Sequence, residues 1–167
     1  MRQYAIEASG GCQCGAVRYH TTAAMDNAHI CHCRMCQKAV GNFFAALVGV
    51  PKDALTWTRG EPATFRSSAN VERGFCARCG TPLFYNDVTS KRIALTIGSF
   101  DNPELFPPQA QDGIEGRLPF FDSLHEIETE TTTEQESEAW AAAIKASSNQ
   151  HPDRDTAAWP PQGGHHA

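Results

Sequence analysis

The spacing of the cysteines constrains this chain more than any other feature of its sequence. Seven cysteines form three groups with the spacings CxC, CxCxxC and CxxC: Cys12 and Cys14; Cys31, Cys33 and Cys36; Cys76 and Cys79. An odd number of cysteines cannot pair completely in disulfides, and in a reducing compartment closely spaced cysteines are more often metal ligands. We therefore expect these thiols to bind metal ions.

Closely spaced cysteines can bring two sulfur atoms to one zinc ion. A tetrahedral zinc ion with Zn–S bonds of about 2.3 Å requires sulfur atoms about 3.8 Å apart. A CxxC pair meets this distance on a tight turn, and Gly80 after Cys79 lets the chain leave that turn with a positive φ angle. A CxC pair on an extended segment projects both side chains to one side. Two such pairs together can complete a closed site.

The simplest partition of the seven thiols gives one closed site and one open site. Cys12, Cys14, Cys76 and Cys79 would form a four-thiolate structural site that ties the N-terminal segment to the middle of the chain. The remaining thiols form a three-thiolate site, and three protein ligands with one open position are typical of a catalytic zinc. The expected ligands of that site are Cys31, Cys33 and Cys36. The sequence thus predicts one zinc ion for each site.

Other interpretations of the cysteines remain open at this point. Buried cysteine often serves as a small apolar residue, but this explains one or two thiols better than three spaced groups. A redox CxxC normally opens a helix of an α/β fold, a pattern that is missing here. A histidine, with His29 as the candidate, could close the three-cysteine site, and iron could replace zinc. His32 lies between two ligands and would point to the opposite side of an extended segment.

Short apolar runs between frequent Gly and Pro residues indicate a mainly β domain. We expect strands at residues 16–21, 43–50, 55–58, 63–66, 83–86 and 92–97, a helical turn at 34–40, and loop over 103–119. A helix is expected from about residue 133 to residue 146, where acidic residues near the start and Lys145 near the end suit the helix dipole. The expected organisation is a zinc-binding domain over 1–130, a helix within 131–146 and a polar, disordered tail over 147–167.

Charge and hydropathy restrict the partners of the chain. Its formal net charge is -5 with neutral histidines, and its basic residues form no stripe, so nucleic acid is not expected as a partner. The longest apolar run, Phe43 to Val50, is too short to span a bilayer, and residues 1–11 lack the apolar centre of a signal peptide. We therefore expect a cytoplasmic protein that does not enter membranes.

The cysteine groups and their neighbours resemble the glutathione-dependent formaldehyde-activating enzyme family, which includes centromere protein V-like domains. The order and spacing of the motifs match over about residues 8–125. The motifs that carry the resemblance are Gly11-Cys12-Gln13-Cys14-Gly15-Ala16-Val17-Arg18-Tyr19, Cys31-His32-Cys33-Arg34-Met35-Cys36-Gln37-Lys38, Phe75-Cys76-Ala77-Arg78-Cys79-Gly80-Thr81 and Gly98-Ser99-Phe100-Asp101-Asn102-Pro103.

This resemblance implies a β-tent fold of packed antiparallel sheets and the same partition of zinc ligands. It also implies a carbon–sulfur lyase that forms S-hydroxymethylglutathione from glutathione and formaldehyde. A zinc-bound thiolate would attack the aldehyde, and a neighbouring acid–base group would move the proton. His32 and His29 are the candidates for that group. Substrate carboxylates could be received by Arg34, Lys38, Arg73 and Arg78, which flank the cysteine groups.

A non-enzymatic zinc module that binds a protein or nucleic-acid partner is the alternative function. A relative that binds a thiol without turning it over is a third. The fourth ligand of the second zinc distinguishes the first two, because an enzyme needs an exchangeable ligand and a scaffold uses a protein side chain.

Overall fold

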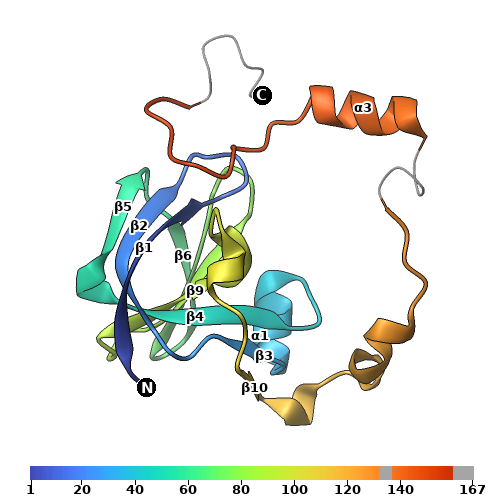
Figure 1. Ribbon diagram of the computed structural model, residues 1–167. Coiled ribbons are helices and arrows are strands. Elements are labelled where there is room, and N and C mark those ends of the chain that lie inside the picture. Colours follow the sequence, from blue (N-terminus) through green and yellow to red (C-terminus); the bar gives the residue numbers. More distant parts are fainter. Residues whose placement is uncertain (132–136, 160–167) are drawn as a thin grey trace.

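The strands of the domain form two sheets (Figure 1). The computed structural model describes residues 1–131 and 137–159. Within them, a three-stranded antiparallel sheet has the order β1-β2-β5, with β1 at Gln3–Gly11, β2 at Arg18–Met25 and β5 at Leu55–Arg59. A seven-stranded sheet has the order β10-β3-β4-β9-β8-β7-β6. Its strands are β3 His29–Cys31, β4 Ala45–Pro51, β6 Ala63–Ser68, β7 Val71–Phe75, β8 Pro82–Asp87, β9 Arg92–Thr96 and β10 Ala110–Asp112.

Helices of the described residues are short and lie between or after the strands. The α-helices are α1 at Arg34–Val40 and α3 at Glu138–Ala146. Single turns or short stretches of 3₁₀ helix occupy Lys52–Ala54, Ile97–Ser99, Pro103–Leu105, Ile114–Gly116 and Pro119–Glu126. The mainly β class with a short C-terminal helix is thereby confirmed.

Each strand that the sequence predicts is present, but the prediction was incomplete. It did not include β1, β3, β7 or β10, and it placed loop where 3₁₀ turns and β10 occur. The sequence of β1 has no clear strand pattern because Ala, Ser and Gly dominate it, although Tyr4 and Ile6 pack against the core. Within the described strands, one pairing departs from the expected antiparallel arrangement: β10 lies parallel to β3, with Asp112 opposite Cys31.

β4 separates two apolar clusters and packs into both. Val48 and Val50 are fully buried in the main core, which fills the space between the two sheets. Leu47 belongs to a smaller cluster that contains Cys36 and Ala45. Successive side chains of a strand point to opposite faces, so a strand covered on both faces has a continuous apolar sequence rather than an alternating one. This double burial explains the apolar run that ends at Val50, and it connects the core to the neighbourhood of a cysteine group.

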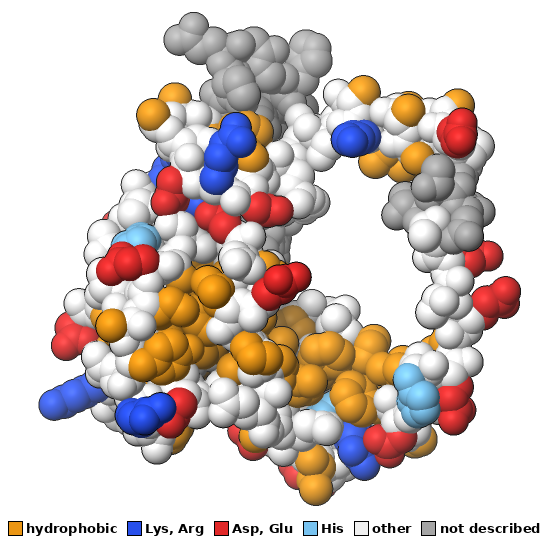
Figure 2. Space-filling view, in the orientation of Figure 1, with side chains coloured by type: hydrophobic (Ala, Val, Ile, Leu, Met, Phe, Trp, Pro, Cys, Tyr) orange, Lys and Arg blue, Asp and Glu red, His pale blue; other side chains and the backbone are white. Residues whose placement is uncertain are grey.

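The C-terminal part of the chain leaves the sheets and then returns to them (Figure 1). α3 is capped by the Ser137 hydroxyl, which accepts from the backbone N–H of Trp140. The predicted helix is confirmed at Glu138–Ala146, and its expected first residues partly lie at 132–136, outside the described residues. Figure 2 shows acidic side chains spaced along the segment that leads to α3. In the described residues no helix is long and apolar enough to cross a membrane.

The division into a domain over 1–130, a helix within 131–146 and a tail over 147–167 stays a prediction. The structure does place the described part of that tail in contact with the first strands. The carboxylate of Asp155 accepts from Arg18 at 2.8 Å, and the indole of Trp159 donates to the carbonyl of Cys14 at 2.7 Å.

Replacing Gly74 by Ala tests the packing between β7 and β8. A Cβ atom at Gly74 would lie 2.0 Å from the ring of Phe84, which is 8% exposed, so the ring must move. We expect a loss of about 1–3 kcal/mol in the free energy of unfolding, measured by urea denaturation. Gly98→Ala is the matched control because a Cβ there meets nothing within 4 Å. Equal stability of the two variants would contradict this packing.

Candidate metal centres

Two turns bring four cysteines together at one end of the main core. Cys12 and Cys14 follow β1, while Cys76 and Cys79 lie between β7 and β8. The Sγ atoms of Cys12 and Cys14 are 3.6 Å apart, and those of Cys14 and Cys76 are 3.8 Å apart. All four Sγ atoms lie within 4.8 Å of one another. These separations match the sulfur spacing of about 3.8 Å around a tetrahedral zinc ion.

The two turns share a backbone design. In the first, Gly15 N–H donates to Cys12 O at 3.0 Å, and in the second, Gly80 N–H donates to Cys76 O at 2.9 Å. Both glycines have positive φ, 70° at Gly15 and 77° at Gly80, a conformation that other residues adopt only with strain. The positive φ angle of Gly80 was predicted from the sequence, whereas that of Gly15 was not.

Burial and hydrogen bonds act in opposite directions on the thiol pKa values of this cluster. Backbone N–H groups of Val17 and Arg78 approach the Sγ atoms of Cys12 and Cys76 at 3.2 and 3.4 Å. Burial raises the pKa of the Cys12 thiol to about 12. Burial also acts to raise the pKa of Cys79, but hydrogen bonds from the Thr81 side chain and backbone outweigh it and lower that pKa to about 6. A metal ion must therefore displace a proton from Cys12 at neutral pH.

The second group comes from one continuous segment beside the smaller apolar cluster. Cys31 ends β3, Cys33 caps α1, and Cys36 lies in the first turns of that helix. Their three Sγ atoms lie within 4.8 Å of one another, and the backbone N–H of Cys36 donates to Cys33 Sγ at 3.4 Å. Cys36 is buried, whereas Cys31 and Cys33 are half-buried, so one side of the cluster is accessible. Among the described residues, no fourth side chain of a kind that binds metals joins this group.

Neither candidate histidine supplies a ligand to the three-cysteine cluster. His29 hydrogen-bonds through Nδ1 to the backbone carbonyl of Asn27 at 2.8 Å. His32 is 0% exposed, and its Nε2 hydrogen-bonds to Gln111 Oε1 at 2.8 Å while its ring meets Phe121 edge-on. The His32 ring is therefore enclosed by Gln111 of β10 and by Phe121 of the segment that follows it.

A wall of chain after β10 encloses the cluster on one side. The side-chain amide of Gln37, which is 2% exposed, donates to the carbonyls of His32 and Gly116, both at 2.9 Å. A Cβ atom at Gly116 would lie 2.7 Å from the His32 carbonyl oxygen, so only glycine allows this approach. Gln37 belongs to the motif that carries the family resemblance, but its role in holding this wall was not predicted, since that role depends on a contact between residues 79 positions apart.

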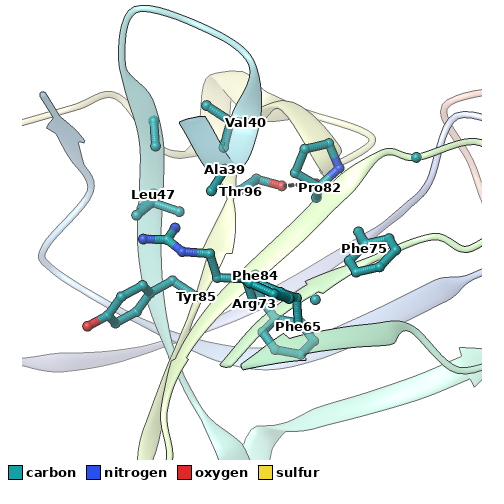
Figure 3. A pocket seen from close by; sticks show the side chains of 13 residues that line it. Ala39, Val40, Leu47, Phe65, Arg73, Phe75, Pro82, Phe84, Tyr85 and Thr96 are labelled. Atoms are coloured by element: carbon teal, nitrogen blue, oxygen red, sulfur yellow. Dashed lines mark hydrogen bonds between the residues drawn. The ribbon is translucent and has the colours of Figure 1, made fainter. Parts of the chain in front are cut away.

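Arg73 connects the three-cysteine cluster to a cavity (Figure 3). Its Nη2 donates to Cys36 Sγ at 3.5 Å, and its guanidinium lies over the ring of Tyr85, 5.2 Å from the centroid. The cavity has a volume of about 230 Å³ and extends between α1 and strands β7 and β8. An adjoining cavity of about 410 Å³ is also lined by Arg73 and adds Arg34 and Lys38. Of the four predicted carboxylate receptors, these three come together, and Arg78 lies at the other cluster instead.

The segment at 151–159 covers the outer side of the first of these turns, the one that holds Cys12 and Cys14. His151, which is 4% exposed, packs edge-on against Trp159 and donates its backbone N–H to the carbonyl of Gln13 at 2.7 Å. Arg59 donates to the hydroxyl of Thr156 at 3.0 Å. We call residues 151–159 the C-terminal strap. Composition alone did not predict it, because its polar residues are held by hydrogen bonds rather than by apolar burial.

Comparison with known proteins gives one family match and one solved structure of similar fold. The model of the family described as "Glutathione-dependent formaldehyde-activating enzyme" matches residues 7–114, which include all seven cysteines. A crystal structure of a Rhodobacter sphaeroides protein, solved by a structural genomics programme, is similar in fold, with a TM-score of 0.51 and 19% sequence identity. The similarity covers 62% of this chain and 98% of that one.

Replacing Gly15 by Ala should detach the C-terminal strap. A Cβ atom there would lie 2.3 Å from His151 and 2.5 Å from Trp159. We expect trypsin to cleave after Arg154 several times faster than in the wild type, as followed by mass spectrometry. Gly80→Ala is the matched control, since it imposes the same positive-φ strain of about 1 kcal/mol but its Cβ meets nothing within 4 Å. Equal cleavage rates in the two variants would show that the strap does not depend on this contact.

Proposed function

Because the chain belongs to the glutathione-dependent formaldehyde-activating enzyme family, we propose that it is a zinc-dependent carbon–sulfur lyase. Its reaction joins a glutathione-like thiol to a small aldehyde such as formaldehyde, and the reverse reaction cleaves the same adduct. The family match supports the general activity, and the two cysteine clusters support the metal. The unpaired state of all seven thiols supports a reducing, cytoplasmic location.

The observation that carries this proposal is the contrast between the two clusters. Four thiols surround one position, whereas three thiols surround the other, where Cys31 and Cys33 are only half-buried. Arg73, which contacts Cys36, also lines a cavity beside this second cluster. Closed four-ligand sites are structural, and three-ligand sites accept water or substrate. We assign Cys12, Cys14, Cys76 and Cys79 to a structural zinc, and Cys31, Cys33 and Cys36 to a catalytic zinc.

The donor set fits zinc. Seven cysteine sulfurs and no carboxylate form the two groups that the described residues bring together, and thiolates favour zinc over magnesium or calcium. When bound, zinc lowers the pKa of a thiol at its open position, so that a thiolate is present at neutral pH.

The chain's own residues hold and balance this chemistry. Three thiolates fix the position on three sides, and the Arg73 guanidinium at Cys36 offsets part of their negative charge. In the forward reaction the substrate sulfur bonds to the carbonyl carbon, the carbonyl π bond breaks, and the proton lost by the thiol ends on the aldehyde oxygen. The role of His32 in moving that proton stays a prediction. Its ring has no exposed surface, so it could not contact the substrate directly.

Two alanine variants should separate the roles of the clusters. We expect Cys33→Ala to lose one of two zinc equivalents and to remain folded, because its cluster lies outside the main core. Cys79→Ala should lose the structural zinc and unfold, since a closed zinc site contributes folding free energy directly. Elemental analysis gives zinc per chain, and circular dichroism reports folding. A folded Cys79→Ala chain with a single zinc in the three-cysteine site would contradict the structural role.

The activity is tested by following adduct formation with ¹³C-formaldehyde and glutathione by NMR exchange spectroscopy. We expect the wild type to accelerate exchange between the free aldehyde and S-hydroxymethylglutathione, and Cys33→Ala to return the rate to that of buffer. Arg78→Gln is the control, since Arg78 is exposed and lies at the four-cysteine turn. Exchange at the buffer rate with zinc-loaded wild type would reject the lyase and favour the alternative, a zinc module without catalysis.

A further inference from the structure

A groove beside the three-cysteine cluster gathers positive charge. It runs between α1 and the β6–β7 hairpin and is formed by the two adjoining cavities of about 230 and 410 Å³. Arg73 and Phe65 line both cavities, so the two are continuous along the hairpin. Figure 3 shows the Arg73 guanidinium among the lining side chains, on the side toward β4 and Tyr85. Arg73 is the link between the groove and the cluster, because it lines both cavities and its Nη2 lies 3.5 Å from Cys36 Sγ.

Three cations line this groove without acidic partners. Arg34 and Lys38 are four residues apart on α1, one turn of helix, so both project to the same side as Arg73. Arg34 donates to the neutral side chain of Gln37 at 3.2 Å. In residues 1–131 and 137–159, no carboxylate lies within ion-pair distance of Arg34, Lys38 or Arg73. By contrast, Arg18, Arg66 and Arg117 each pair with an acidic residue there.

Apolar side chains border the same groove. Phe65 is 62% exposed and Met35 is 63% exposed, and both line the larger of the two cavities. A ligand that bridges them would have an uncharged middle and anionic groups near α1. The groove thus selects by charge and by length.

We propose that this groove binds the carboxylate-bearing arm of the thiol substrate, with Arg34 and Lys38 as the residues that determine its specificity. This inference rests on the proposed function for the position of the reacting sulfur. The thiol enters the open side of the three-cysteine cluster, the peptide-like middle lies along Phe65, and the carboxylates meet Arg34 and Lys38. Arg73 lies between the position of the substrate sulfur and the positions of the substrate carboxylates.

This assignment excludes Arg78 and predicts a discrimination between thiols. Charge-assisted hydrogen bonds to a carboxylate act on an anionic thiol and leave an uncharged thiol unaffected. Removal of both cations should therefore weaken binding of a dicarboxylate by about tenfold, because partly exposed charge pairs each contribute only a few-fold. The chemistry at the cysteine sulfurs should stay unchanged.

The experiment compares Arg34→Gln/Lys38→Gln with Arg2→Gln/Lys91→Gln, a control that removes two exposed cations outside the groove. The probe is S-methylglutathione, which keeps the carboxylates but has no free thiol, and its dissociation constant is measured by calorimetry on the zinc-loaded proteins. A rise of about tenfold in the groove variant with no change in the control supports the proposal. An equal change in both variants, or none in the groove variant, overturns it.

A second readout separates this proposal from the lyase assignment. With glutathione, the groove variant should show a raised KM and an unchanged kcat, and with 2-mercaptoethanol both constants should match the wild type. If the wild type binds S-methylglutathione at Arg34 and Lys38 but catalyses no exchange, the lyase is rejected and the groove stands. If the wild type catalyses exchange but does not bind S-methylglutathione, the groove is rejected and the lyase stands.

Discussion

The contact of four sulfur atoms between two distant turns is the constraint on which the rest of the structure depends. One turn ends β1 of the small sheet, and the other connects β7 and β8 of the large sheet. These sheets also pack through the main core, whose buried members include Cys12 and Cys76. A metal ion at this point would fix the distance between the sheets where the core ends, and so would set the orientation of β7 and β8 toward α1.

β4 carries that order from the core to the reactive side of the molecule. Its Val48 and Val50 belong to the main core, while Ala45 and Leu47 support Cys36 from the other face. Close packing on both faces leaves little room for β4 to shift, so the three-cysteine segment packs against a rigid strand. The accessible side of the cluster is then bounded by side chains such as Arg73 and Tyr85, which can adjust to a ligand without movement of the sheet.

The cysteine groups were predictable from sequence because metal ligands follow local spacing rules. The CxC and CxxC pairs specify sulfur distances without reference to the fold, and their partition needed only the count of ligands. The C-terminal strap, Gln37 and the partnership of Arg73 with Cys36 were not predictable, since each depends on a contact between segments far apart in sequence. β10 was missed for a related reason: a strand of three exposed residues has no pattern of its own and is defined only by its pairing with β3.

The parallel pairing of β10 with β3 has a consequence for how replacements act on this site. β3, which delivers Cys31, is held along both edges by β4 and β10, and the wall over His32 begins immediately after β10. The family match ends at residue 114, where that wall starts. Anchorage and enclosure are thus encoded by separate stretches of chain. Replacements beyond Gly113 would therefore act first on the wall that packs against His32 and Cys33, and only through it on the strand that holds Cys31.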